Sequence, residues 1–484
     1  MRRRAMHCNS CRCLGPLVAI CAALGSASAC KRRAPEPAPS AQPSASAAPV
    51  VQAPRCSEPF PGKSFTLGDK SSEGADAGAQ DDDDGTDQPA LPFAVALGRG
   101  VAFGEGFAVS ALRTSGGKTT AVVALLDAQA GSGRLAELGP LHADPDPPEL
   151  AVLEDDLIAL VHDSDAGGET LKLAALRPGA QKAEVVLGAE IAESRDESRA
   201  ADVELGPERG VALWDEWSVS DKHGVIVSTS FARKDVSNVS KKRVVSAPTE
   251  DAEAPRLVRR PGGFWAAWVA RTVAPKQKLL PGKKPGGPAP APSAEAPDVP
   301  VVELGERFIS VVPLDANGVA SAEPKPATPK NAHVVVFDLA TGPDGSALLS
   351  WRDDDSAPAS DERRIHLARV RADGSVERHP VEDEGTGVGA PALVVDATPK
   401  DPNAPWAWLA LDSVSDTTRL AAVNAGANLL DALGPEPVVR SAEVLAVSRG
   451  RLLVARPRGL AMELGVVECK PGPAPVPAPA PSAK

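Results

Sequence analysis

The sequence contains no tyrosine, and aromatic residues make up only 3% of its 484 positions. Seven histidines, scattered along the chain, offer little for metal binding or acid–base chemistry. The net charge is −12, so the chain lacks the basic surplus that nucleic-acid binding requires, and we expect no nucleic-acid partner. No G-x-S-x-G nucleophile motif and no complete G-x-x-x-x-G-K-[ST] phosphate loop occurs. The sequence therefore predicts no catalytic residue and no cofactor-binding residue.

Cysteine is absent from the long central part of the chain, between Cys56 and Cys469. Ahead of it, "MRRRAMHCNSCRC" is basic, and "LGPLVAICAAL" is apolar over about 11 residues, too short to span a bilayer. These features predict a signal peptide over residues 1–29. The following "GSASAC" resembles the lipobox of bacterial lipoproteins, although Ala27 stands where leucine is usual. The resemblance implies a lipid anchor at Cys30, with simple cleavage as the alternative.

Export would leave two cysteines for pairing, because the leader and the lipid would take the other five. In an oxidising compartment an even pair predicts a disulfide between Cys56 and Cys469, joining the ends of the folded region. We therefore expect an exported protein, anchored by lipid at the periplasmic or outer surface of a bacterial envelope.

Proline, alanine and serine dominate three stretches that lack apolar periodicity. We interpret them as a tether over residues 30–55, an insertion near 275–300 and a tail over 470–484. An acidic loop lies near 73–88. The folded domain is predicted over 56–469.

This domain consists of short apolar runs that end in turn signals, which is typical of β-strands. Asp373-Gly374 and Asn317-Gly318 each stand between alternating segments and predict hairpins. Trp214, Trp268 and Trp351 recur in similar runs, about 54 residues apart once the insertion is subtracted. A repeat of about 50 residues with room for four strands predicts an all-β propeller of seven blades. Six or eight blades, or two β-sandwich domains, are the alternatives.

Closure of the propeller ring would explain why Cys56 and Cys469 stand at the two ends of the domain. The last repeat supplies three strands, so "KSFTLG" after Cys56 is predicted to add the fourth, and the disulfide would pin that closure. In this general organisation the chain resembles bacterial β-propeller lipoproteins, without a motif of any named family.

Acidic residues cluster in the predicted turns between the second and third strands of the blades. Such turns share one rim of a propeller, where carboxylates could bind calcium or a cationic partner, although Asp also favours solvated turns. The candidate rim residues are Asp163, Asp165, Asp215, Asp221, Asp353, Asp354 and Asp412.

The function predicted from these features is non-enzymatic: a monomeric binding or scaffolding module for a protein or glycan partner at the envelope, held to the membrane by its lipid. The alternative is an envelope hydrolase that cleaves glycans with rim carboxylates, since such enzymes need two facing carboxyl groups.

Overall fold

The computed structural model describes one compact unit of the chain, which falls within Val50–Lys484. The residues described are 55–57, 64–68, 95–115, 118–142, 146–165, 168–178, 183–194, 200–273, 306–353, 364–381, 391–396, 405–413, 417–423, 438–440, 443–459 and 461–470. The predicted signal peptide, the lipid-anchor residue Cys30, the tether, the acidic loop, the insertion near 275–300 and the tail past 470 lie outside them.

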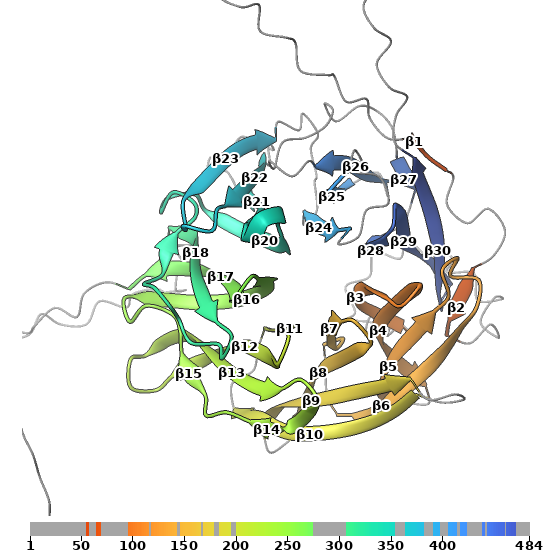
Figure 1. The fold of residues 1–484 in the computed structure, drawn as a ribbon, viewed down its shortest axis with the longest axis horizontal. Helices are drawn as coiled ribbons and strands as arrows, with labels where there is room; N and C mark the ends of the chain where they lie inside the picture. The colour runs from red at the N-terminus through yellow and green to blue at the C-terminus, as the bar shows by residue number, and fades with distance from the viewer. Residues whose placement is uncertain are drawn as a thin grey trace, which may run out of the picture. The chain divides into compact units, whose positions relative to one another are not determined.

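Seven antiparallel sheets form a ring, and each sheet is one blade of a propeller (Figure 1). In blades 1 to 6 the strands follow chain order from an inner strand at the ring's centre to an outer strand at its edge, whereas the outer strands of blade 7 come from the start of the domain. The prediction of a seven-bladed, all-β propeller is confirmed.

The first three blades are built from consecutive strands. Blade 1 comprises β3 (Val95–Phe103), β4 (Gly106–Ser115), β5 (Lys118–Leu126) and β6 (Gly133–Leu141). Blade 2 comprises β7 (Glu149–Leu153), β8 (Asp156–Asp165), β9 (Gly168–Pro178) and β10 (Ala183–Ser194). Blade 3 comprises β11 (Ala201–Leu205), β12 (Arg209–Ser218), β13 (His223–Ala232) and β14 (Asp235–Val239), with β15 (Arg243–Val244) also paired to β13.

The next three blades repeat this order. Blade 4 comprises β16 (Glu250–Arg260), β17 (Gly263–Thr272), β18 (Arg307–Asp315) and β19 (Lys325–Pro326). Blade 5 comprises β20 (Val334–Thr341), β21 (Ala347–Asp353), β22 (Arg364–Val370) and β23 (Val376–Val381), with a short 3₁₀ turn at Pro343–Gly345. Blade 6 comprises β24 (Ala392–Val395), β25 (Ala407–Ser413), β26 (Thr417–Val423) and β27 (Val438–Arg440).

Blade 7 joins the two ends of the domain. Its chain-terminal strands are β28 (Glu443–Ser448), β29 (Arg451–Arg458) and β30 (Ala461–Lys470). β1 (Arg55–Cys56) and β2 (Phe65–Leu67) both pair antiparallel with β30, as Figure 1 shows at the meeting of its red and dark-blue strands. Cys56 lies opposite Cys469, and the two form a disulfide. The predicted closure strand and the predicted disulfide are both confirmed.

The core lies between the blades, because each sheet is apolar on both faces and needs a neighbour on each side. Trp265 of blade 4 and Trp351 of blade 5, for example, share one buried cluster, and each is at most 2% exposed. The expected hairpins also form: Gly318 and Gly374 have positive φ angles of 73° and 79°, which only glycine adopts readily.

Candidate functional site in the central channel

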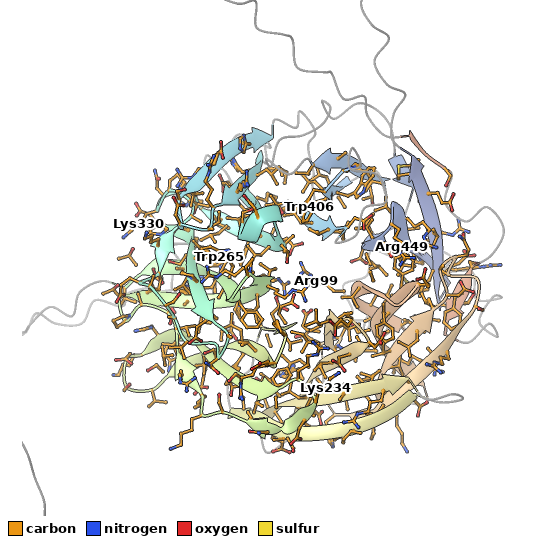
Figure 2. The ribbon with its side chains drawn as sticks, in the orientation of Figure 1. Arg99, Lys234, Trp265, Lys330, Trp406 and Arg449 are labelled. Atoms are coloured by element: carbon orange, nitrogen blue, oxygen red, sulfur yellow. A yellow bond between two sulfur atoms is a disulfide. The ribbon has the colours of Figure 1, made fainter. Side chains whose placement is uncertain are left out.

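A cavity of about 1170 Å³ runs along the ring's axis and is lined by the inner strands of all seven blades that the structure describes. Figure 2 places Arg99 near the centre of the ring and Trp406 on its inner wall. The wall combines apolar and charged side chains, and the charged residues that the inner strands contribute are Arg99, Glu149, Glu204, Arg256, Arg259, Asp338 and Glu443.

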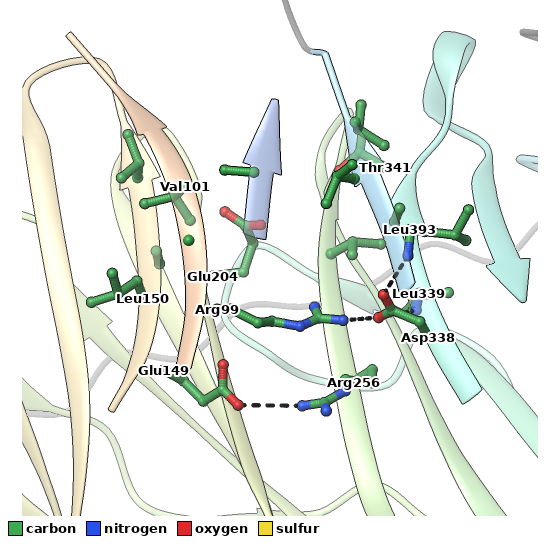
Figure 3. Close-up of a pocket in the computed structure, with 18 of the residues that line it drawn as sticks. Arg99, Val101, Glu149, Leu150, Glu204, Arg256, Asp338, Leu339, Thr341 and Leu393 are labelled. Atoms are coloured by element: carbon green, nitrogen blue, oxygen red, sulfur yellow. Dashed lines mark hydrogen bonds and ion pairs between the residues drawn. The ribbon is translucent and has the colours of Figure 1, made fainter. Parts of the chain in front are cut away.

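Two ion pairs bridge different blades inside the cavity (Figure 3). Arg99 of β3 donates through Nη2 to Oδ1 of Asp338 on β20. Arg256 of β16 places Nη1 3.4 Å from Oε1 of Glu149 on β7. The arginines enter from blades 1 and 4 and their partners from blades 5 and 2, so the two pairs span the channel rather than follow its wall.

Asp338 also joins two neighbouring blades through the backbone. Its Oδ1 accepts the N–H of Leu339, and its Oδ2 accepts the N–H of Leu393 on β24, both at 2.8 Å. Asp202 on β11 repeats the arrangement with the N–H groups of Val203 and Leu257, again at 2.8 Å. Both carboxylates are almost fully buried, at 3% and 5% exposed. Each carboxylate is therefore an inter-blade clamp, because it binds a backbone N–H group of the next blade. Among the described residues, only Asp338 of these two also forms an ion pair with an arginine.

Glu204 lies two residues beyond Asp202 on the same strand, with its side chain in the cavity wall (Figure 3). Its Oε1 accepts the N–H of Leu205 at 2.8 Å. Burial raises the pKa of Glu204 to about 7, with Asp202 acting in the same direction; the backbone N–H groups of Leu205 and Arg259 and the charge of Arg259 oppose the rise. Near neutral pH this carboxyl group exists in both protonation states.

The ion-paired groups are perturbed as well. Burial raises the pKa of Glu149, although the nearby Arg256 and Arg99 favour its charged form. Burial and repulsion from Arg256 lower the pKa of Arg99. Charged groups that are held in a wall of low polarity and interact with one another are typical of a functional site.

Two residues of the cavity wall also hold buried polar atoms that make no hydrogen bond among the described residues. These atoms are Nη1 of Arg259 and both ring nitrogens of His162, whose Nε2 lies 3.6 Å from Oε2 of Glu169. Trp406 is partly buried in the same wall and donates through Nε1 to the carbonyl of Thr341 at 3.0 Å. The cavity thus offers hydrogen-bond donors, an aromatic surface and titratable carboxyl groups together.

The predicted rim residues occupy other positions. Asp163 accepts the N–H of His142 at 2.9 Å, and Asp215 accepts the N–H of Ala200 at 2.9 Å and that of Ala254 at 3.1 Å. His142 and Ala200 belong to the chain that enters blades 2 and 3. These two carboxylates therefore secure the crossings between blades.

The remaining rim candidates differ from one another. Asp353 places Oδ2 2.7 Å from Nε2 of His366. Asp221 is exposed and accepts hydrogen bonds from the hydroxyl groups of Ser218 and Ser220. The side chains of Asp165 and Asp412 and the whole of Asp354 lie outside the described part of the structure. None of the four candidates whose side chains the structure describes, Asp163, Asp215, Asp221 and Asp353, is among the residues that line the cavity.

Within the described ranges, no group of three or more His, Cys, Asp or Glu side chains is placed to hold a metal ion. Calcium binding at the rim stays a prediction. No helix among those same residues is long and apolar enough to cross a membrane.

Sequence reasoning missed the channel residues, although one signal was available. Asp202 and Asp338 each stand four residues before a turn glycine, in "DVELG" and "DLATG", inside otherwise apolar runs. An aspartate at the same distance before the turn glycine in two buried strands indicates that each carboxylate has a specific hydrogen-bond or ion-pair partner, because burial of an unpaired charge is costly.

No family model matches the chain, and no curated protein matches it. Among solved structures, similar folds include the polysaccharide lyase Uly1, with 9% identity, 87% of this chain and 99% of the other covered, and a TM-score of 0.45. A Penicillium chrysogenum α-L-arabinanase complexed with arabinobiose has 11% identity, coverage of 85% and 98%, and a TM-score of 0.41. The β-propeller domain of the Trilobed protease from Pyrococcus furiosus has 11% identity, coverage of 78% and 95%, and a TM-score of 0.42.

The prediction that the protein is not an enzyme is contradicted by these comparisons, because the lyase and the arabinanase are enzymes that share its propeller fold. At such identities the likeness extends to the fold alone. The comparisons therefore assign no reaction and no substrate to this chain.

Proposed function

We propose that the protein is a carbohydrate-active enzyme that cleaves a glycosidic bond in its central channel, with Glu204 as the group that donates the proton. One observation carries the proposal: a single cavity brings Glu204, Glu149, Arg259 and Trp406 together. Its volume of about 1170 Å³ is ample for a ligand of several sugar rings, since small-molecule sites occupy roughly 300–1,000 Å³.

Cleavage of a glycosidic bond needs one protonated carboxyl group and a second, charged carboxylate. Glu204 suits the first role, because its pKa of about 7 leaves a proton available at neutral pH. Glu149 is the candidate for the second role: burial raises its pKa, while Arg256, 3.4 Å away, and Arg99 favour the negative form. The proton of Glu204 passes to the oxygen that leaves, while Glu149 assists attack on the sugar carbon either directly or through water.

The other residues of the wall suit sugar binding. The indole of Trp406 offers an apolar face for a sugar ring, and Arg259 brings a guanidinium group to the same wall. This assignment replaces the rim carboxylates of the sequence-based alternative with carboxyl groups of the inner strands.

We further propose that the enzyme acts outside the cytoplasm, at a bacterial envelope, with Cys30 as its lipid anchor. Support comes from the Cys56–Cys469 disulfide, since disulfides persist mainly in oxidising compartments.

The test is the release of reducing ends from a panel of arabinan, xylan, levan, pectate and peptidoglycan by the full-length protein. Glu204→Gln should lower kcat by about 100-fold or more on the cleaved polymer and remove the fall of activity above pH 7. Glu149→Gln should lower kcat by a similar factor. Arg371→Gln, which changes an exposed ion pair on blade 5 with Glu377, is the matched control and should retain full activity. Absence of cleavage across the panel, or a fully active Glu204→Gln variant, would overturn the proposal.

A further inference from the structure

One tryptophan of this chain is exposed to an unusual degree. Trp217, near the end of β12, is 48% exposed. Five of the other six tryptophans, Trp214, Trp265, Trp268, Trp351 and Trp408, are at most 2% exposed, and the sixth, Trp406, is partly buried in the channel wall. Exposure of so large an apolar ring on a surface is typical of a binding site.

The local strand pairing explains why the ring is uncovered. Trp217 lies opposite Gly224 on β13, which has no side chain to cover the indole. Two residues farther along the chain, Val219 is 83% exposed in the turn that follows. Trp217 and Val219 thus form a small apolar ledge at the end of blade 3.

Polar groups of blade 4 continue from this ledge. The N–H of Gly224 donates to Oδ1 of Asp251 at 2.7 Å, which ties the two blades together beside Trp217. Asp251 lies opposite Arg271 in the strand register, and Arg271 lies opposite Arg307. A row of one carboxylate and two guanidinium groups therefore crosses blade 4 at the same end of the propeller.

The two arginines share one carboxylate, and their side chains stay partly exposed, at 30% for Arg271 and 19% for Arg307. Both bind Oε1 of Glu253, Arg271 at 3.2 Å and Arg307 more closely. Like charges directly opposite each other in a sheet repel, and one shared carboxylate offsets only part of that repulsion. The Nε atoms of both arginines are buried and have no hydrogen-bond partner among the described residues.

We infer that this surface, formed by Trp217, Val219, Asp251, Arg271 and Arg307, is a second glycan-binding site that holds the polymer away from the channel. The C–H face of a sugar ring packs on the indole, and the ring's hydroxyl groups bind the carboxylate and the guanidinium groups. None of these residues lines the channel cavity, so the site is separate from the cleavage site. The choice of a glycan as ligand rests on the proposed function.

The test measures binding without cleavage, by affinity electrophoresis of the full-length protein in gels that contain each polysaccharide of the panel above. All variants carry Glu204→Gln, which prevents turnover. Trp217→Ala should weaken binding at least 10-fold, so that retardation falls to the level that the channel alone produces, and Trp217→Phe should retain most of it. Arg271→Gln should weaken binding about threefold. Leu187→Ala removes another exposed apolar side chain, 59% exposed on blade 2, and should change nothing.

The outcomes separate the two proposals. Retardation that depends on Trp217, in a protein that cleaves nothing, supports the surface site and overturns the channel proposal. Cleavage with retardation that Trp217→Ala leaves intact overturns the surface site alone, as does an absence of retardation on every polymer. Binding lost equally in Trp217→Ala and Leu187→Ala would also overturn it, because the effect would then not be specific to the site.

Discussion

Asp338 and Leu393, 55 residues apart, are joined by a 2.8 Å hydrogen bond from the Leu393 N–H to Oδ2 of Asp338, which ties blade 5 to blade 6. Asp202 and Leu257 form the same bond between blades 3 and 4. In both bonds the two residues are 55 positions apart, which is about the length of one blade repeat. An aspartate on the inner strand therefore links its blade to the next one in two places.

Asp338 and Asp202 should differ in how much each contributes to the free energy of unfolding. Asp338→Ala should lower the free energy of unfolding by about 3 kcal/mol, because it frees two N–H groups and leaves Arg99 without its carboxylate. Asp202→Ala removes a clamp but breaks no arginine ion pair among the described residues, and it should lower the free energy of unfolding by about 2 kcal/mol. Urea unfolding of both variants gives the comparison. In the Asp338→Ala background, Arg99→Met should recover about 1 kcal/mol, and no recovery would show that the pair contributes nothing.

The raised pKa of Glu204 predicts how stability depends on pH. The folded state binds its proton up to about pH 7, whereas the unfolded chain releases it near 4.5. Stability contributed by the protonated form is therefore complete below pH 4.5, declines between pH 4.5 and about 7, and is absent above. The free energy of unfolding should fall by up to about 3 kcal/mol between these pH values, because each unit of difference between the folded and unfolded pKa of Glu204 corresponds to about 1.36 kcal/mol. Glu204→Gln should flatten this part of the curve, measured by urea unfolding at pH 5, 6, 7 and 8. An unchanged slope would place the Glu204 carboxyl at an ordinary pKa.

The Cys56–Cys469 disulfide should stabilise the closed ring strongly, because it closes a loop of 413 residues. The chain-entropy relation gives roughly 6 kcal/mol for such a loop, and real bridges deliver about 2–5 kcal/mol. The Cys56→Ser, Cys469→Ser double variant should therefore melt at a clearly lower temperature. Reductant should lower the melting temperature of the wild-type protein and leave that of the double variant unchanged. An equal response of both proteins would mean that the bridge has no effect on stability.

Substitution of Asp215 should lower the free energy of unfolding, whereas substitution of Asp221 should leave it almost unchanged. Asp215→Ala removes the acceptor for the N–H groups of Ala200 and Ala254 and should cost about 1–3 kcal/mol. Asp221→Ala changes an exposed turn residue on the same blade and should stay within about 0.5 kcal/mol of wild type. Equilibrium unfolding of the two variants, side by side, measures the difference; equal losses would contradict the inter-blade role assigned to Asp215.

Much of the architecture could be predicted from the sequence because its causes are local or periodic. Asp373-Gly374 specifies a hairpin through the backbone freedom of glycine, and the regular spacing of Trp214, Trp268 and Trp351 reports one repeat per blade. Two cysteines at the ends of a cysteine-free domain indicated both the disulfide and the strand that closes blade 7. Each of these inferences needs only residue type and distance along the chain.

The channel could not be predicted this way, because its chemistry depends on which residues the closed ring brings together. Arg99 and Asp338 are 239 residues apart, and the sequence around either residue gives no indication that the two form an ion pair. Glu204 looks like an ordinary charged residue in "ADVELG", and only its burial in the closed ring moves its pKa to about 7. The order of strands and turns along the chain determined the seven blades and the closure of the ring. Only the tertiary structure decided which carboxylates bind the next blade, because burial and contacts across the ring determine whether a charged side chain is stabilised.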